Sequence, residues 1–193
     1  MTIFRRAFLV TPLVVLLLGA CGAPEGGPPK ASEAQINALA ASIVELRDDV
    51  DPSEAARAAR IAYDYPLQLA AQYGITDSPL AHNRKVNRGQ RPRGLCWHWA
   101  EDLQARLNSE NFQTLEVHRA IANGLNPILI SHSTALISAK GDGMYDAIVV
   151  DPWRYGGKLF WSKTLEDKRY DWYPRLEILS ERRRRRLAYE GEL

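Results

Sequence analysis

The sequence has 193 residues, of which 46% are hydrophobic and 25% are charged, a composition typical of a globular protein with one domain. It carries 25 basic and 23 acidic side chains, and two of the basic ones, Arg5 and Arg6, lie in a segment that we expect to be removed. The remaining chain is then formally neutral, so no overall field attracts nucleic acid and we expect no nucleic-acid partner.

Residues 1–20 have the features of a secretory signal peptide. The basic pair is followed by a run, residues 7–18, that is apolar apart from Thr11 and Pro12. This run is shorter than the roughly 20 residues that cross a membrane, which favours a cleaved signal over a transmembrane helix.

Residues 18–21, Leu-Gly-Ala-Cys, resemble the lipobox of bacterial lipoproteins. The resemblance implies that Cys21 becomes the lipid-modified N-terminus and that its lipid chains anchor the protein to a membrane. Gly22 is similar to the residue that sorts lipoproteins to the outer membrane, facing the periplasm. Residues 21–31 are rich in Pro and Gly and are predicted to be a tether, which leaves residues 32–193 as one folded domain. A plain signal peptide with an incidental cysteine is the alternative.

Two helices are predicted at the start of the domain. Ser32 and Gln35 form a capping box for the first, and Asp51 followed by a proline opens the second. We expect a break near Tyr65-Pro66, after which residues 67–73 either continue this helix or start another, and an end at Gly74. Neither helix carries residues that suggest chemistry, so both are predicted to be packing elements.

The basic stretch from residue 76 to residue 94 is predicted to be an irregular loop. A run of charge is usually solvated, but this one directly precedes a lone cysteine. It is therefore also a candidate wall of a substrate cleft.

Cys96 is expected in the first turn of an amphipathic helix that begins after Gly94 and ends near Asn108. Apolar residues follow it at helical spacing: Trp99, Ala100, Leu103 and Leu107. A thiol at a helix N-terminus faces unpaired N–H groups and the positive end of the dipole, which favour the reactive thiolate. With Cys21 lipidated, Cys96 is the one remaining thiol, and in an oxidising compartment such a thiol must be buried or used. A small buried hydrophobe is the alternative.

After this helix the apolar period changes from 3.6 to 2, which predicts antiparallel strands. We expect strands over residues 113–122, 128–138, 145–151 and 158–162. The chain is therefore predicted to be an α+β domain, with helices packed on an antiparallel sheet. The run from Arg182 to Arg186 is expected on a short terminal helix, solvated or in contact with anionic envelope phosphates.

A two-residue turn at Gly141-Asp142 would place Leu136 opposite Ala147 and His132 opposite Asp151. Opposed Cβ atoms lie about 4.5–5.5 Å apart, so the aspartate could accept the imidazole N–H and fix its tautomer. A one-residue bulge would break this pairing. The alternatives are a core histidine and an aspartate that caps a turn.

The other histidines are weaker candidates. His98 lies two residues after the cysteine, about 200° around the helix, and points away from the thiol. His118 lies on the polar face of its strand, and His82 lies in the predicted loop without an evident partner. No group of His, Cys, Asp and Glu has metal-site spacing, so we expect no metal and no cofactor.

Residues 80–165 resemble the transglutaminase-like branch of the papain-type cysteine enzymes. The matching features are Gly94 two residues before Cys96 at a helix start, a histidine on a strand at His132, and the later Asp-Pro at Asp151. The family often has an aromatic residue where this chain has Thr134. The resemblance implies a papain-like fold in which Cys96 attacks, His132 transfers the proton and Asp151 orients the imidazole.

Such chemistry requires donors for the developing oxyanion, and the backbone N–H of Cys96 is one. Gln90 lies six residues before Cys96-Trp97, a spacing similar to that in papain, and is the candidate second donor. Asn83 and Asn87 are its rivals.

The expected function is acyl transfer at an amide of a peptide or protein substrate in the envelope, by hydrolysis or transamidation through a thioester. One alternative is a peptidoglycan endopeptidase of the NlpC type. Another is a lipid-anchored binding module without catalysis, in which Trp153, Trp161 and Trp172 line a groove.

Overall fold

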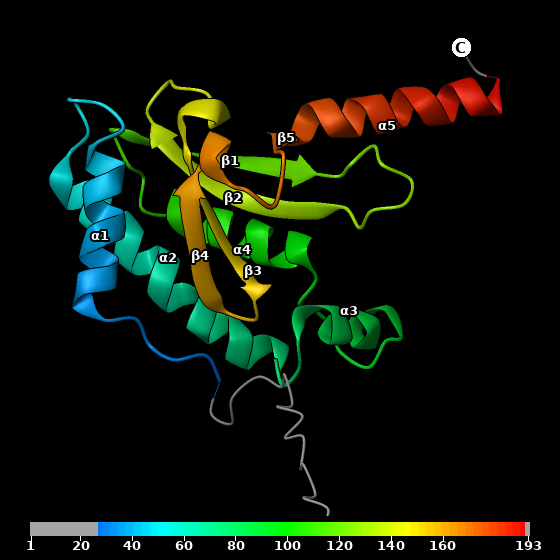
Figure 1. Cartoon of the computed structure of the whole chain (residues 1–193), viewed down its shortest axis with the longest axis horizontal. Helices are drawn as coiled ribbons and strands as arrows, with labels where there is room; N and C mark the ends of the chain where they lie inside the picture. The colour runs from blue at the N-terminus through cyan, green and yellow to red at the C-terminus, as the bar shows by residue number, and fades with distance from the viewer. Residues whose placement is uncertain (1–26, 192–193) are drawn as a thin grey trace, which may run out of the picture.

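The computed structural model describes residues 27–191, so the expected signal peptide, Cys21 and the first part of the tether lie outside the described chain. Within these residues the protein is an α+β domain (Figure 1). The helices are α1 (Glu33–Val44), α2 (Pro52–Tyr73), α3 (Pro79–Asn87), α4 (Cys96–Asn108) and α5 (Arg175–Glu190), and the short 3₁₀ turns are η1 (Met144–Asp146) and η2 (Thr164–Glu166). The strands are β1 (Leu115–Ala122), β2 (His132–Ala139), β3 (Ile148–Tyr155), β4 (Lys158–Lys163) and β5 (Tyr173–Pro174).

The first helix begins as its sequence predicts, but the second continues past its expected break. Ser32 and Gln35 form the capping box of α1, and the Asp51 side chain accepts the N–H groups of the first turn of α2. Pro66 lies inside α2, which ends only at Gly74 in the left-handed conformation. Ala62 and Leu69, on either side of the proline, are fully buried. Their packing offsets the hydrogen bond that proline cannot make.

The basic stretch before the cysteine is not entirely irregular, because α3 forms within it. Ser78 is the N-cap residue and Pro79 occupies the first turn, while Arg84 and Lys85 lie near the C-terminal end. Proline suits the first helical position and cations suit the last turn, so these residues favour a short helix. The expectation of a continuous loop was wrong.

The five described strands form one antiparallel sheet in the order β4-β3-β2-β1-β5. Leu136 pairs with Val149, two residues beyond the predicted partner, Ala147. The connection is longer than a two-residue turn because η1 lies within it. Since strand side chains alternate between faces, a displacement of two residues leaves each on its expected face.

Helices α1, α2 and α4 cover one face of the sheet, where the larger core lies (Figure 1). Leu39, Ala58 and Leu107 from these helices meet Ile137 and Val150 of the sheet, and all five are fully buried. A smaller cluster lies on the opposite face, where buried residues of the sheet pack against Trp172. The sheet is thus buried on both faces.

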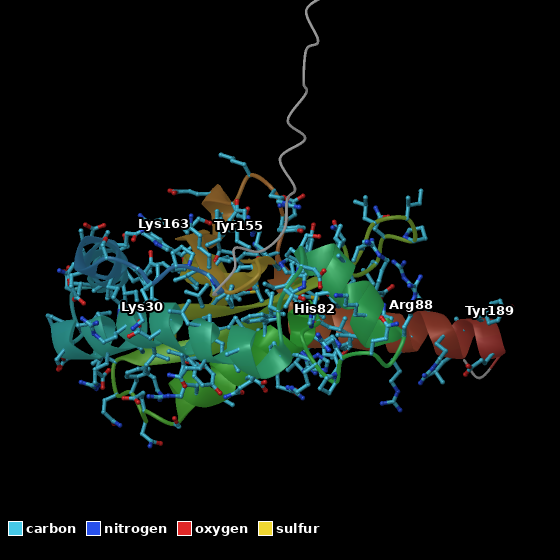
Figure 2. All side chains as sticks on the ribbon, turned by 90° about the horizontal axis from the view of Figure 1, so that it is seen from below. Lys30, His82, Arg88, Tyr155, Lys163 and Tyr189 are labelled. Atoms are coloured by element: carbon cyan, nitrogen blue, oxygen red, sulfur yellow. The ribbon has the colours of Figure 1, made fainter. Side chains whose placement is uncertain are left out.

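The loop between β1 and β2 and the helix α5 extend from the domain at one end (Figure 1). Ile128, Leu129 and Ile130, predicted to begin a strand, lie instead in the loop and are 89%, 53% and 62% exposed. Figure 2 shows Tyr189 near the far end of α5, where it is largely exposed. In the part of the chain that the structure describes, no helix is both long and apolar enough to cross a membrane.

Candidate active site

Cys96 is the first residue of α4, and its N-cap residue is Leu95 rather than Gly94. Its thiol is largely buried, with 9% of the residue exposed, and packs near Trp99 and Trp153. The sulfur lies 3.8 Å from the carbonyl oxygen of Ser131, just before β2. The first turn of a helix therefore brings the one described cysteine against the start of the central strand.

Gly94 is required where the chain turns into α4. It has a φ of +120°, and a Cβ at this position would lie 2.4 Å from Nε2 of His82. His82, predicted to lack a partner, is buried on α3 (Figure 2). Its Nε2 lies 3.0 Å from the carbonyl oxygen of Arg93. The contact fixes α3 against the turn that precedes Cys96, so His82 is a packing residue.

His132 and Asp151 form a buried pair. Nε2 of His132 lies 2.7 Å from Oδ2 of Asp151, and the two side chains are 2% and 1% exposed. The observed register, extended by one pair, puts Asp151 diagonally across from His132 rather than directly opposite. Because a carboxylate only accepts, Nε2 carries the hydrogen that His132 donates. The sequence thus predicted the contact correctly from a register that was wrong by two residues.

The other ring nitrogen of His132, Nδ1, is buried and has no hydrogen-bond partner within residues 27–191. Cys96 is nevertheless close enough to favour the charged ring. Burial lowers the pKa of His132, but the Asp151 carboxylate and the Cys96 thiol outweigh it and raise this pKa to about 9. Burial raises the pKa of Asp151, but the charges of His132 and Arg154 reverse this and hold that pKa below its usual value. The favoured state is therefore an imidazolium beside a carboxylate.

A second ion pair supports Asp151, and the sequence analysis missed it. Nε of Arg154 donates to Oδ2 of Asp151 at 3.1 Å, and its other two nitrogens bind both oxygens of Asp167 at 3.1 and 2.6 Å. Nε1 of Trp172 also donates to Asp167, at 2.9 Å. The predicted strand ended at Asp151, whereas β3 continues to Tyr155, so Arg154 was not predicted as a neighbour of the aspartate. The irregular pairing of β3 between Asp151 and Tyr155 permits this contact.

Aromatic rings enclose the imidazole of His132. The ring centroids of Trp153, Tyr170 and Trp172 lie 4.6, 4.6 and 5.3 Å from that of His132. Trp161 lies elsewhere, half-buried, and donates to the hydroxyl of Tyr63 at 2.9 Å. The three tryptophans do not line one groove; two of them exclude water from the histidine.

The candidate oxyanion donors lie in different surroundings. Gln90 is exposed in the turn after α3, and its backbone N–H donates to the carbonyl of Lys85. Asn87 is also exposed. Oδ1 of Asn83 accepts from Nε1 of Trp153 at 3.2 Å, which places its amide next to the enclosure of His132. Of the three amide side chains, that of Asn83 is hydrogen-bonded to a residue that encloses His132.

The remaining histidines are bound within the fold. Nδ1 of His98 accepts the backbone N–H groups of Gly94 and Leu95, both at 3.1 Å, and thereby caps α4. Burial and the charge of Arg93 lower the pKa of His98, which keeps this acceptor neutral. Nε2 of His118 lies 2.7 Å from Oγ of Ser138.

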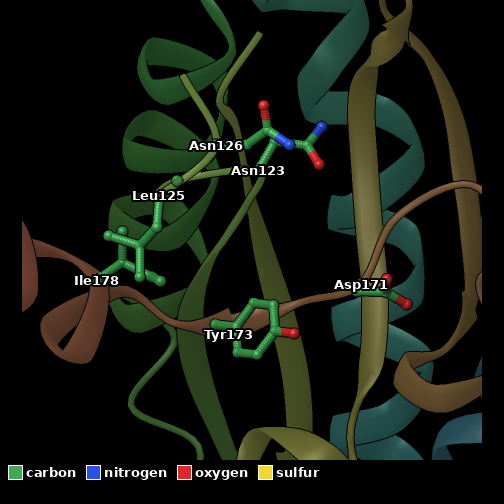
Figure 3. A pocket seen from close by; sticks show the side chains of 7 residues that line it. Asn123, Leu125, Asn126, Asp171, Tyr173 and Ile178 are labelled. Atoms are coloured by element: carbon green, nitrogen blue, oxygen red, sulfur yellow. The ribbon is translucent and has the colours of Figure 1, made fainter. Parts of the chain in front are cut away.

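A cavity of about 340 Å³ lies between the β1–β2 loop, the segment that contains β5 and the first turn of α5. Asp171 and Tyr173, which flank Trp172, line it together with Asn123 from the end of β1. Figure 3 shows Leu125 and Ile178 on one side of this cavity and Asp171 on the other. None of Cys96, His132 and Asp151 lines this cavity, so it is not the space in which the proposed chemistry would occur.

No cluster of three or more His, Cys, Asp and Glu side chains suited to a metal ion occurs within residues 27–191. The comparisons with protein families, curated proteins and solved structures find no match to this chain.

Proposed function

We propose that the protein is a transglutaminase-like cysteine enzyme that transfers an acyl group from a peptide or protein amide. The observation that carries this proposal is the buried His132–Asp151 pair, next to which Sγ of Cys96 lies 3.8 Å from the carbonyl oxygen of Ser131, the residue before His132. A nucleophile, a base and a group that orients the base form the arrangement that activates a thiol for attack on carbonyl carbon.

The proposed reaction begins from the state in which the Cys96 proton already resides on Nδ1 of His132, so that the sulfur is a thiolate beside the imidazolium. The thiolate attacks the amide carbon, and the backbone N–H of Cys96 stabilises the resulting oxyanion at the start of α4. As the C–N bond breaks, His132 returns the proton to the leaving amine and a thioester remains on Cys96. Water or an amine then attacks the thioester and restores the thiol. Asp151 keeps Nδ1 directed at the sulfur throughout.

A papain-like relation between the elements is part of the proposal. Its support is the order of the parts: a cysteine at a helix start, then a histidine and an aspartate on adjacent antiparallel strands. The proposed envelope location rests on residues 18–21 alone, which resemble a lipobox. Loss of membrane association in a Cys21→Ala variant is the outcome expected if Cys21 carries the lipid.

The experiment that tests the proposed chemistry is trapping of the thioester. The full chain is mixed with an activated acyl ester, and the adduct on Cys96 is followed by intact mass and by its cleavage with hydroxylamine. We expect acylation of the native chain to be about 100-fold faster than that of a His132→Gln variant, because general-base catalysis contributes at least this much. A Cys96→Ala variant is the control for reaction elsewhere. Equal acylation of the native and His132→Gln chains would refute the proposed base.

A further inference from the structure

A second pocket, which we call the cationic pocket, lies at the edge of β1 beside the start of α5. It has a volume of about 320 Å³, and its charged or titratable lining residues are Arg119, Arg175 and His118. No acidic side chain lines it. Two guanidinium groups thus share one opening without a carboxylate in its wall.

One buried hydrogen-bond donor of Arg119 has no acceptor in the part of the chain that the structure describes. Nη2 donates to the carbonyl of Trp97 at 3.2 Å and to Oγ of Ser133 at 3.4 Å, but Nε is buried without a hydrogen-bond partner. Neither Arg119 nor Arg175 forms an ion pair within residues 27–191. A buried donor without a partner costs free energy, which a bound acceptor would recover.

The charges around Arg119 also favour a bound anion. Burial and the nearby charge of Arg175 both lower the pKa of Arg119. Glu101 and Asp102 act in the opposite direction, but both carboxylates pair with Arg93, at 3.5 and 2.7 Å. An anion between the two guanidinium groups would relieve their repulsion.

The backbone at this pocket also favours an anion. Arg175 is the first residue of α5, and the N-cap residue, Pro174, supplies no side-chain acceptor to the free N–H groups. Glu177, the acid of that first turn, does not line the pocket. Unpaired N–H groups at a helix start add donors and positive potential to those of the arginines.

The cationic pocket is coupled to the thiol. Nη2 of Arg119 donates to the carbonyl of Trp97, the residue after Cys96, at 3.2 Å. We propose that this pocket binds a carboxylate of the peptide substrate while the amide lies at Cys96; its role as a substrate subsite rests on the proposed function. A planar carboxylate matches the paired donors of guanidinium better than a spherical anion does.

The test measures binding without turnover, in the full chain carrying Cys96→Ala. The probes are glutarate, its neutral analogue glutaramide and inorganic phosphate, and the readout is the Nε–Hε resonance of each arginine in ¹⁵N spectra. Glutarate is expected to shift the Arg119 and Arg175 signals saturably, whereas glutaramide leaves them unchanged. An added Arg175→Gln substitution should weaken glutarate binding about tenfold, since it removes one charge-assisted contact. Arg186→Gln, an exposed arginine on the same helix, is the matched control and should have no effect.

Three outcomes would overturn the subsite: no saturable shift with glutarate, equal loss in both arginine variants, or tighter binding of phosphate than of glutarate. The thioester experiment fails independently of these. Saturable glutarate binding without acylation would support the anion site and refute the proposed catalysis. Acylation without glutarate binding would support the catalysis and refute the anion site.

Discussion

At the scale of single residues, the site depends on charges that are buried and paired. Asp151 lies between two cations, His132 and Arg154, and Arg154 is in turn held by both oxygens of Asp167. Each of these four groups would be costly to bury alone, because water is absent and the local dielectric is low. The four groups compensate one another's charge, so removing one of them leaves a buried charge without its partner and destabilises the fold.

Arg154→Met tests this dependence. The substitution keeps much of the side-chain length but leaves Asp167 buried without its cation, so we expect the free energy of unfolding to fall by about 3 kcal/mol or more. Urea denaturation gives the value. The control is Arg169→Met, because Arg169 is exposed and should change stability by about 0.5 kcal/mol or less. Similar losses in both variants would contradict the assigned role of Arg154.

At the scale of elements, hydrogen bonds from Arg182 connect α5 to the β1–β2 loop. Nε of Arg182 donates to the carbonyl of Gly124 at 2.8 Å, and Nη2 donates to Oγ of Ser131 at 2.9 Å. The carbonyl of Ser131 is the group that contacts the sulfur of Cys96. Arg182, expected to be solvated or in contact with envelope phosphates, instead holds α5 against the loop that ends at Ser131.

Arg182→Ala should loosen this loop. We expect the large electrophile N-phenylmaleimide to modify Cys96 several-fold faster in this variant, because opening of the loop exposes the sulfur. Arg183→Ala is the matched control, since Arg183 is exposed and its side chain makes no hydrogen bond within residues 27–191. If the two variants react at the same rate, Arg182 does not govern access.

The sequence was sufficient for features set by local chemistry and insufficient for those set by tertiary packing. The caps of α1 and α2, the position of Cys96 and the shared face of His132 and Asp151 follow from capping residues and periodicity. Pro66 was misjudged because buried neighbours outweigh its local preference. Arg154 was missed because the predicted strand ended at Asp151, and no period-2 pattern encodes the strand irregularity that follows.

At the scale of the whole molecule, the buried pair links folding to pH. The pKa of His132 rises from an unfolded value of about 6.5 to about 9 in the folded chain, so the folded state holds its proton more tightly. The stability from this group is fully present below about pH 6.5 and is lost as pH rises through about 9. The lowered pKa of Asp151 has the opposite sign, and its contribution is lost in acid.

Denaturation at pH 6 and pH 9.5 measures this linkage. We expect the native chain to lose roughly 3 kcal/mol between these values from His132 alone. A His132→Gln variant, which cannot bind the proton, should lose much less over the same range. An equal loss in both chains would show that other groups cause the dependence.

The central claim is that Cys96, His132 and Asp151 act as one unit, and the rate of Cys96 alkylation by iodoacetamide tests it most directly. Measured near neutral pH, the native chain should react faster than a model thiol, because His132 and the first turn of α4 activate the sulfur. His132→Ala should slow the reaction, and Asp151→Asn should slow it through loss of the ring's orientation. Equal rates in the native chain and in His132→Ala would contradict the account.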